Sequence, residues 1–194
     1  MTSDTDPLER FQALYHALQQ HNLPEPAAVT LATASLAGKP SARTVLLKEF
    51  DERGFVFYTN LASRKARDLE ANPQAALCFY WEPIHYQLRV EGRVELVSSE
   101  EADAYFATRP RGSQIGAWAS RQSATLSNRA ELEAGFQEYE SRFAGKDVPR
   151  PDFWSGYRLV HDWMEFWERR EDRLHERTLY TRTERGWQVS LLFP

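Results

Sequence analysis

The stretch RTVLLKEFDERGFVFYTNLASRKARDLEANP, residues 43–73, predicts how the rest of the chain is organised. Two runs rich in β-branched and aromatic residues, 44–47 and 55–58, flank the polar turn at 51–54. Ser63 then provides a hydroxyl that favours the start of a helix. We therefore expect a strand, a turn, a second strand and a short helix in direct succession.

The first turn of that predicted helix carries two cations, Arg64 and Lys65. A helix start has unpaired N–H groups and a positive dipole end, so cations are unfavourable there unless an anion joins them. Two cations, the Ser63 hydroxyl and free amides together predict a phosphate site. The alternative is that both side chains point into water, and the local sequence favours neither interpretation.

The composition is typical of a globular protein with a sizeable core. The chain has 194 residues, of which 42% are hydrophobic and 13% aromatic, which is enough for one domain. Its net charge of −4 argues against a general nucleic-acid binder, so any anion site must be local. No apolar run has membrane-spanning length and no signal pattern begins the chain, which predicts a cytoplasmic protein without membrane contact.

Cysteine and histidine usage predicts neither a disulfide nor a metal site. Cys78 is the single cysteine and lies in the apolar run AALCFYW, which favours a packing residue in a reducing compartment. His16 and His21 are five residues apart and do not share a helix face, so we interpret both as solvated. We expect no bound metal.

The remaining apolar runs predict an α+β fold with an antiparallel, barrel-like sheet and flanking helices. Short turns between strands favour antiparallel pairing and closure of the sheet. A single domain is expected over 1–194, with a helical segment at 1–26 and C-terminal strands within 149–194 that complete the barrel. Further strands are predicted at 28–35, 75–81, 87–97 (with Gly92 as a bulge or bend), 157–167, 174–181 and 187–192.

Two clusters of basic residues are candidate binding groups. On the predicted strand RLHER, alternation places Arg173, His175 and Arg177 on one face, where they repel one another unless a negative or aromatic group covers them. An exposed edge face in water is the alternative. Arg109, Arg111 and Ser113, with Gly112 and Gly116 nearby, are a candidate second anion site in a backbone nest, or else part of a solvated basic loop.

Polar and aromatic residues on other predicted strands have two interpretations each. Gln87 and Arg89 share a face, which indicates either hydrogen-bonded structure or a ligand contact. Trp163 and Trp167 also share a face. Core packing is the more frequent use of tryptophan, although an indole ring can also form the wall of a site for a planar cofactor.

Several of these motifs together closely resemble the pyridoxine/pyridoxamine 5'-phosphate oxidase family of flavoenzymes, from about residue 28 to the C-terminus. Each motif alone is weak evidence, but their shared order and spacing are specific. The resemblance implies an FMN-binding split β-barrel, used as a homodimer with the flavin sites at the subunit interface. The motifs are RTVLLK (43–48), FYTN (57–60) with SRK (63–65), RPRGSQIGAWAS (109–120), EFW (165–167) and RLHER (173–177).

The resemblance also implies a residue set for FMN. It assigns the phosphate to Arg43, Arg64 and Lys65, near Thr59, which coincides with the predicted helix-start site. It assigns the remaining flavin contacts to Thr44, Val45, Leu46, Leu47, Lys48, Tyr58, Gln87, Gln122, Ser123, Trp167 and Arg177.

The implied reaction is oxidation of pyridoxamine or pyridoxine 5'-phosphate to pyridoxal 5'-phosphate, with dioxygen as acceptor and hydrogen peroxide as product. The resemblance places Arg173 and His175 over the substrate ring as the catalytic pair. It assigns substrate binding to Lys48, Tyr105, Arg109, Ser113, Arg173, Leu174 and His175. Two alternatives stay open: a related flavin oxidase acting on another substrate, such as a phenazine precursor, and a non-catalytic protein that binds FMN or pyridoxal phosphate.

Overall fold

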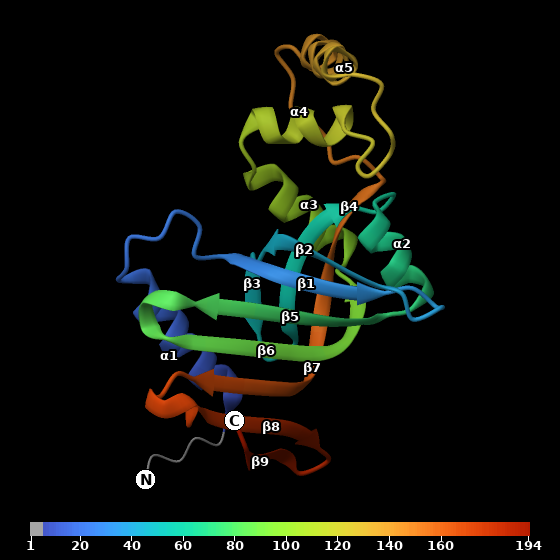
Figure 1. Ribbon diagram of the computed structural model, residues 1–194. Helices are drawn as coiled ribbons and strands as arrows, with labels where there is room; N and C mark the ends of the chain where they lie inside the picture. The colour runs from blue at the N-terminus through green and yellow to red at the C-terminus, as the bar shows by residue number, and fades with distance from the viewer. Residues whose placement is uncertain (1–5) are drawn as a thin grey trace.

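The computed structural model describes residues 6–194, which form a nine-stranded antiparallel sheet that curls into a half-barrel (Figure 1). The first five residues of the predicted helical segment at 1–26 lie outside this described part. The strands are β1 (Ala28–Ala34), β2 (Pro40–Leu46), β3 (Glu49–Asp51), β4 (Gly54–Asn60), β5 (Gln74–Trp81), β6 (Tyr86–Leu96), β7 (Trp154–Glu168), β8 (Glu176–Thr183) and β9 (Gly186–Leu192).

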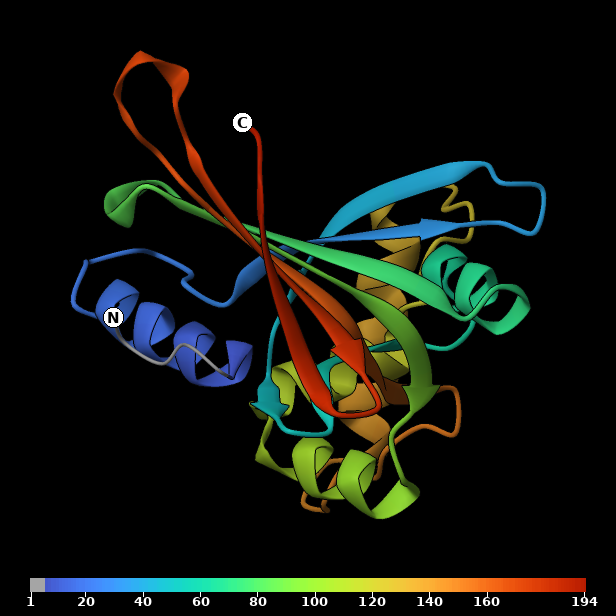
Figure 2. The same cartoon turned by 90° about the horizontal axis from the view of Figure 1, so that it is seen from below.

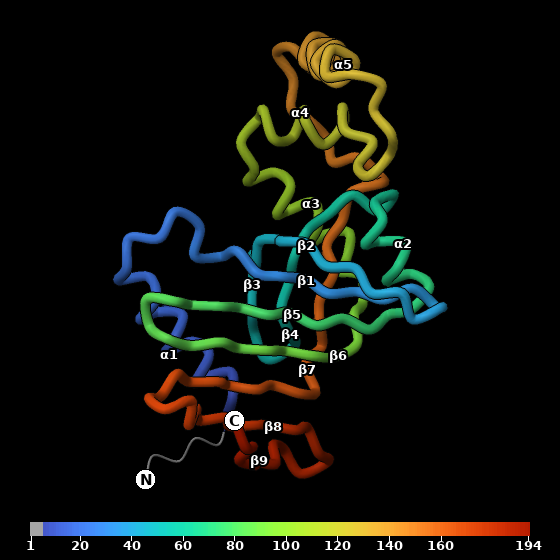
Figure 3. The backbone as a smooth tube through the Cα atoms, viewed as in Figure 1, coloured from blue at the N-terminus to red at the C-terminus, as the bar shows by residue number. Residues whose placement is uncertain are grey.

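Within residues 6–194, five α-helices and two short 3-10 turns lie outside the sheet. The backbone trace in Figure 3 shows α4 and α5 stacked beyond one end of the sheet, far from β8 and β9. None of these helices combines the length and the apolar composition needed to span a bilayer. The elements are α1 (Pro7–Gln19), α2 (Arg64–Ala71), α3 (Ser99–Thr108), α4 (Arg111–Ala119), α5 (Arg129–Arg142), η1 (Glu82–Ile84) and η2 (Glu171–Arg173).

Strand β7 is the longest element and links the two ends of the molecule. Along one edge it pairs with β6 over nearly its whole length. Along the other edge, residues 154–159 pair with β4 and residues 163–168 pair with β8. The start of β7 therefore lies beside β4, and its end lies beside β8.

The connection at Leu47 and Lys48 closes the curled sheet. In the strand order β2-β1-β5-β6-β7-β4-β3, the strands that this connection joins lie at opposite ends. The Leu47 amide donates to the carbonyl of Ala27 on one side, and the Lys48 amide donates to that of Val56 on the other, both at 2.9 Å. The strand predicted over 44–47 ends at Leu46, and the hairpin partner of β4 is the separate strand β3 rather than β2.

Local sequence signals place several helix ends and a bend as predicted. Ser63 is the cap of α2, and its hydroxyl accepts from the Ala66 amide. Gly92 marks a β-bulge where β6 changes register against β7. A side chain at this position would place its Cβ 2.0 Å from the carbonyl oxygen of Val160, so only glycine allows the two strands to approach.

The core lies between the concave side of the sheet and α1. The Phe11 ring is fully buried and contacts the rings of Phe55, Phe79 and Trp81 at centroid distances of 5.0, 5.5 and 5.6 Å. Helix α1 begins at Pro7, because the side chain of Asp6 accepts from the Leu8 amide and Pro7 occupies the first turn. This packing fixes the sheet that carries the polar groups discussed below.

The predicted strand face of Arg173, His175 and Arg177 is wrong for its first two members. Arg173 belongs to η2, and β8 begins only at Glu176. Asp172 and Arg173 have φ of 53° and 61°, and two successive left-handed residues cannot continue an extended strand. Arg177 alone lies on the strand, while Arg173 and His175 belong to the turn that precedes it.

Candidate functional site

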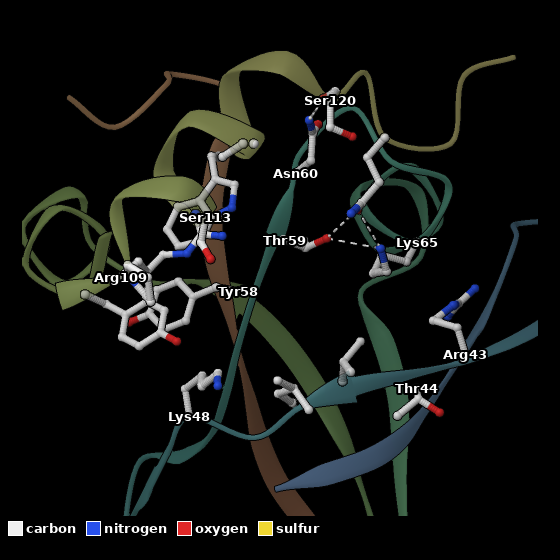
Figure 4. Close-up of a pocket in the computed structure, with 18 of the residues that line it drawn as sticks. Arg43, Thr44, Lys48, Tyr58, Thr59, Asn60, Lys65, Arg109, Ser113 and Ser120 are labelled. Carbon is white, nitrogen blue, oxygen red and sulfur yellow. Dashed lines mark hydrogen bonds between the residues drawn. The ribbon is translucent and has the colours of Figure 1, made fainter. Parts of the chain in front are cut away.

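A cavity of about 670 Å³ lies between the β2–β4 region and helices α2, α3 and α4 (Figure 4). The volume is within the range typical of small-molecule sites. The cavity brings together many of the residues that the sequence assigns to cofactor or substrate: Arg43, Thr44, Val45, Leu46, Lys48, Tyr58, Thr59, Lys65, Tyr105, Arg109, Ser113 and Gln122.

Lys65 forms one cationic wall of this cavity, at the start of α2. Its ammonium donates to the side-chain oxygens of Thr59 (3.1 Å, Figure 4), Gln122 (2.9 Å) and Ser63 (3.4 Å). Burial, and secondarily the positive charge of Arg43, lowers the pKa of Lys65. Among residues 6–194 no carboxylate pairs with this ammonium, so its charge is available to an anion.

Arg109 forms a second cationic wall, at the junction of α3 and α4. Its guanidinium carbon lies 4.7 Å from the centre of the Trp154 ring, and burial lowers its pKa. One terminal nitrogen, Nη1, is buried and has no hydrogen-bond partner in the described residues. A buried, unsatisfied donor is costly unless a ligand completes it. Ser113 lines the cavity one turn into α4.

Three nearly parallel aromatic rings line the cavity beside Arg109. The Tyr58 ring stacks on Tyr105 at 4.0 Å and 11°, and on Trp154 at 5.3 Å and 5°. Burial, and then the charge of Glu49, raises the pKa of Tyr58, so its hydroxyl stays protonated at neutral pH. Such a stack offers aromatic surface against which a planar ring can pack.

The sequence interpretation missed Trp154 and Asn60, which also line the cavity. Trp154 begins β7, three residues before the predicted strand start. The run FW at 153–154 is a strand signal that lies just before the predicted start. Asn60 donates to the carbonyl of Ser120 at 3.1 Å and so ties β4 to the end of α4.

Four other residues predicted to bind FMN either have protein partners of their own or lie outside the cavity. Arg43 lines the cavity, but it donates to Thr33 Oγ1 (2.9 Å) and Ser41 Oγ (2.6 Å), and Asp68 lies 4.0 Å away. Figure 4 shows its guanidinium turned away from Lys48 and Arg109. Arg64 is exposed and does not line the cavity. Leu47 is buried in the core, and Ser123 is exposed beside Gln122.

The other predicted residues form a separate group, on the ends of β6, β7 and β8 and in the turn between β7 and β8. Gln87 faces Trp167 across one strand pair, and Trp167 faces Arg177 across the next. The His175 ring lies 4.5 Å from the Trp167 ring. Arg173 and Leu174 are exposed in the turn. We call Gln87, Trp167, Arg173, Leu174, His175 and Arg177 the C-terminal group.

The cavity and the C-terminal group lie far apart in one chain. Trp154 and Trp167 are thirteen residues apart on the same strand, which corresponds to roughly 40 Å of extended backbone. In both views the turn after β7 is remote from α3 and α4 (Figures 1 and 2). One bound molecule of nucleotide size cannot touch both groups of the same chain. In addition, no cluster of three or more His, Cys, Asp or Glu side chains suited to a metal occurs within residues 6–194.

Comparison with known proteins places this geometry in a family. Residues 16–143 match the family model described as pyridoxamine 5'-phosphate oxidase. Residues 154–194 match the model described as the pyridoxine 5'-phosphate oxidase C-terminal dimerisation region. The C-terminal group, apart from Gln87, thus lies in a segment associated with dimerisation.

Individual relatives agree with these matches. A Myxococcus xanthus (strain DK1622) protein named pyridoxine/pyridoxamine 5'-phosphate oxidase is 55% identical over 189 residues, which cover 97% of this chain and 92% of the relative. The crystal structure of PhzG from Burkholderia lata 383 with tetrahydrophenazine-1-carboxylic acid has a TM-score of 0.94 at 31% identity, covering 100% of this chain and 95% of that one.

A more distant structure shares the fold. It is a pyridoxamine 5'-phosphate oxidase-related, FMN binding protein from Nostoc punctiforme, with a TM-score of 0.77 at 19% identity, covering 97% of this chain and 98% of that one. The predicted split-barrel fold is therefore confirmed. With both family models matched and the M. xanthus relative identical at more than half of the aligned positions, this chain belongs to the pyridoxine/pyridoxamine 5'-phosphate oxidase family.

Proposed function

We propose that the protein is an FMN-dependent oxidase that converts pyridoxamine 5'-phosphate and pyridoxine 5'-phosphate to pyridoxal 5'-phosphate, with dioxygen as acceptor and hydrogen peroxide as product. The name of the M. xanthus relative supports this reaction. The observation that carries the proposal is the pair of cationic walls in one cavity, Lys65 and the unsatisfied Arg109. A reaction between a phosphorylated cofactor and a phosphorylated substrate needs two such anion holders.

The cavity residues fit FMN on one side and the substrate phosphate on the other. Lys65, Thr59 and Gln122, with the free amides at the start of α2, are suited to the cofactor phosphate. Lys48, Arg109 and Ser113 are suited to the substrate phosphate. The stacked rings beside Arg109 offer a surface for flat groups.

We further propose that each complete site is built by two subunits of a homodimer. The cavity of one chain lies too far from its own C-terminal group, while the match of 154–194 to a dimerisation region provides a reason for a partner's group to lie near it. In a two-fold dimer the same exchange happens twice, giving two equivalent sites. The cytoplasmic location stays a prediction from the sequence.

The protein's part in the reaction is positioning. Holding both phosphates fixes substrate and cofactor against each other, which lowers the activation barrier by on the order of several kcal/mol. FMN, when bound, supplies a two-electron acceptor for the hydride equivalent of the substrate's exocyclic carbon and passes the electrons to dioxygen. Arg173 and His175, contributed by the partner chain, orient the pyridine ring and stabilise charge on it. For the amine substrate, water then hydrolyses the resulting imine to the aldehyde.

The likeness to PhzG supports a second candidate, oxidation of a phenazine precursor. A carboxylated tricyclic ligand also needs an anion holder and a flat surface. The lower identity to PhzG, 31% against 55% for the M. xanthus relative, favours the vitamin phosphate. Direct comparison of the two substrates distinguishes the candidates.

The purified protein tests the proposal through its flavin absorbance. We expect FMN to bind at least about tenfold more tightly than riboflavin, because the Lys65 wall and the α2 start contact the phosphate by charge-assisted hydrogen bonds. Anaerobic addition of pyridoxamine 5'-phosphate should bleach the flavin band, and air should restore it with formation of peroxide.

Lys65→Ala provides the control for the cofactor site. It should weaken FMN binding towards that of riboflavin while leaving riboflavin binding and the circular dichroism spectrum unchanged. Equal affinity of the parent for FMN and riboflavin would exclude the phosphate site. A flavin that neither vitamer phosphate bleaches, but a dihydrophenazine carboxylate does, would establish the second candidate.

A further inference from the structure

Glu165 is a buried carboxylate that the reaction outlined above does not use. It lies on β7, its side chain is 2% exposed, and two arginines contact it from the neighbouring strands. Arg177 Nε on β8 donates to Oε1 at 2.6 Å, and Arg89 Nη1 on β6 donates to Oε2 at 3.1 Å. A carboxylate this deeply buried is tolerated only when it is paired and hydrogen-bonded, and both conditions are met.

These contacts fix the Arg177 guanidinium in one orientation. While Nε donates to Glu165, Nη1 donates to the carbonyl of Phe193 at 2.9 Å. Within residues 6–194 the third nitrogen, Nη2, has no hydrogen-bond partner, and the side chain remains 27% exposed. The hydrogen bond to Glu165 raises the pKa of Arg177, so the donor stays charged. Two of the three guanidinium nitrogens are therefore held, and Nη2 is left to donate to a ligand.

The charge balance of this cluster differs from that of an anion site. Arg89 also pairs with Glu91, so the four charged groups Arg89, Arg177, Glu91 and Glu165 sum to zero. A net positive charge attracts a phosphate. A cluster of zero net charge with one available donor, Arg177 Nη2, suits a neutral acceptor such as a ring carbonyl.

We propose that Glu165 is a positioning residue for the flavin ring. It holds Arg177 so that Nη2 donates to a neutral acceptor of the ring, and it cancels the positive charge that would otherwise favour a second phosphate. This inference rests on the proposed function, because it takes Arg177 as a flavin contact. Glu165 itself, at 2% exposure, does not reach the ligand.

The test measures FMN dissociation by flavin fluorescence in the dimeric holoprotein. Glu165→Gln keeps the shape of the side chain but removes its charge, and Arg177→Lys removes the forked donor. We expect each to weaken FMN binding at least about tenfold, equivalent to about 1.4 kcal/mol. The double variant should bind no more weakly than Arg177→Lys alone, because Glu165 acts through Arg177.

Two further variants make the result specific. Glu91→Gln removes a carboxylate of the same cluster that does not contact Arg177, and it should leave FMN affinity at the parent value. Glu165→Asp retains the charge but shortens the side chain by one methylene, so it should fold and still weaken FMN binding several-fold. It replaces Glu165→Gln if that variant does not fold.

The outcomes separate this inference from the proposed function. Parent-like FMN affinity in Glu165→Gln, or in Glu165→Asp, together with weakened binding in Arg177→Lys overturns the role of Glu165 alone. Additive losses in the double variant, or an equal loss in Glu91→Gln, overturn it as well. If Arg177→Lys binds FMN like the parent, or the parent does not bind FMN, the flavin assignment itself fails.

Discussion

The cavity and the C-terminal group use the same kinds of residue in opposite ways. In the cavity, Lys65 and Arg109 are desolvated, have lowered pKa values and pair with no carboxylate within residues 6–194. In the C-terminal group, Arg177 is paired with the buried Glu165 and its pKa is raised. The first arrangement leaves positive charge that suits an anion, and the second leaves one oriented donor that suits a neutral acceptor. Whether a basic residue has a carboxylate partner therefore indicates whether its site suits an anion or a neutral hydrogen-bond acceptor.

Strand β7 explains why one chain contains both arrangements. Its first residue, Trp154, supports Arg109 in the cavity, and Trp167 near its end pairs with Arg177. The strand separates the two halves, and the two-fold symmetry of a homodimer would bring unlike halves together. If this is correct, each half should be complemented by the other half of a second chain.

The largest expected effect is complementation between two defective subunits. Lys65→Ala damages the cavity and Arg177→Ala damages the C-terminal group, so each homodimer should bind FMN weakly at both sites. In a heterodimer with one subunit of each kind, one site carries both defects and the other carries neither. We expect this heterodimer to bind one FMN per dimer with the parent's affinity, measured by flavin titration after isolation through two different affinity tags.

The matched control is a heterodimer of the parent with the double variant Lys65→Ala/Arg177→Ala. If sites are shared, both of its sites carry one defect and both should bind weakly. If each site lies within one chain, the result reverses, because the parent subunit keeps an intact site and the complemented heterodimer has none. The two heterodimers therefore decide whether the halves belong to one chain or to two.

The next effect concerns charge in the cavity. Arg109→Gln keeps a polar side chain of moderate length but removes the charge that the substrate phosphate would contact. A charge-assisted hydrogen bond contributes about 1.5–3 kcal/mol, so we expect KM for pyridoxamine 5'-phosphate to rise roughly 10- to 100-fold. The turnover number should change little, because the phosphate is held alike in the ground and transition states. Steady-state peroxide production with the FMN-saturated enzyme measures both constants.

A specific control accompanies this prediction. Arg111 lies two residues away on α4, but its guanidinium donates to the carbonyls of Phe143 and Lys146 rather than lining the cavity. Arg111→Gln should therefore leave KM unchanged. A parent-like KM in Arg109→Gln would show that the unsatisfied nitrogen is not a substrate contact.

Local signals in the sequence predicted the parts of the fold that depend on neighbouring residues. Ser63 starts a helix and Gly92 forms a bulge, because each effect acts within a few residues. The end of β2 at Leu46 and the separate strand β3 were not predictable in this way. Both depend on the closure of the sheet at Leu47 and Lys48, where the chain stops pairing with β1 and begins to pair with β4.

Candidate residues were predictable by type, but their grouping was not. The helix-start pattern identified Lys65, yet nothing local distinguished it from the exposed Arg64 beside it. Trp154 was missed because its role depends on Arg109, which is 45 positions earlier in the chain and stacks on its ring. Alternation failed at Arg173, since a regular strand pattern contains no signal for two left-handed residues.

The smallest expected effect tests the turn that the strand prediction misplaced. Arg173 has φ of 61°, is exposed and forms no ion pair within residues 6–194, unlike Arg177. A non-glycine residue held in this conformation is strained, and such strain is often retained at functional sites.

If the partner's cavity faces this turn, Arg173 contacts the substrate ring but not the flavin. Arg173→Ala should then retain FMN and the dimer but lose at least about tenfold in kcat/KM, or roughly 1.4 kcal/mol of transition-state stabilisation. Lys48→Ala, in the cavity, should mainly raise KM instead. Kinetics of aldehyde formation, with flavin content and sedimentation for each variant, distinguish the two. Full activity of Arg173→Ala would remove the turn from the active site and leave the cavity as the whole of the substrate site.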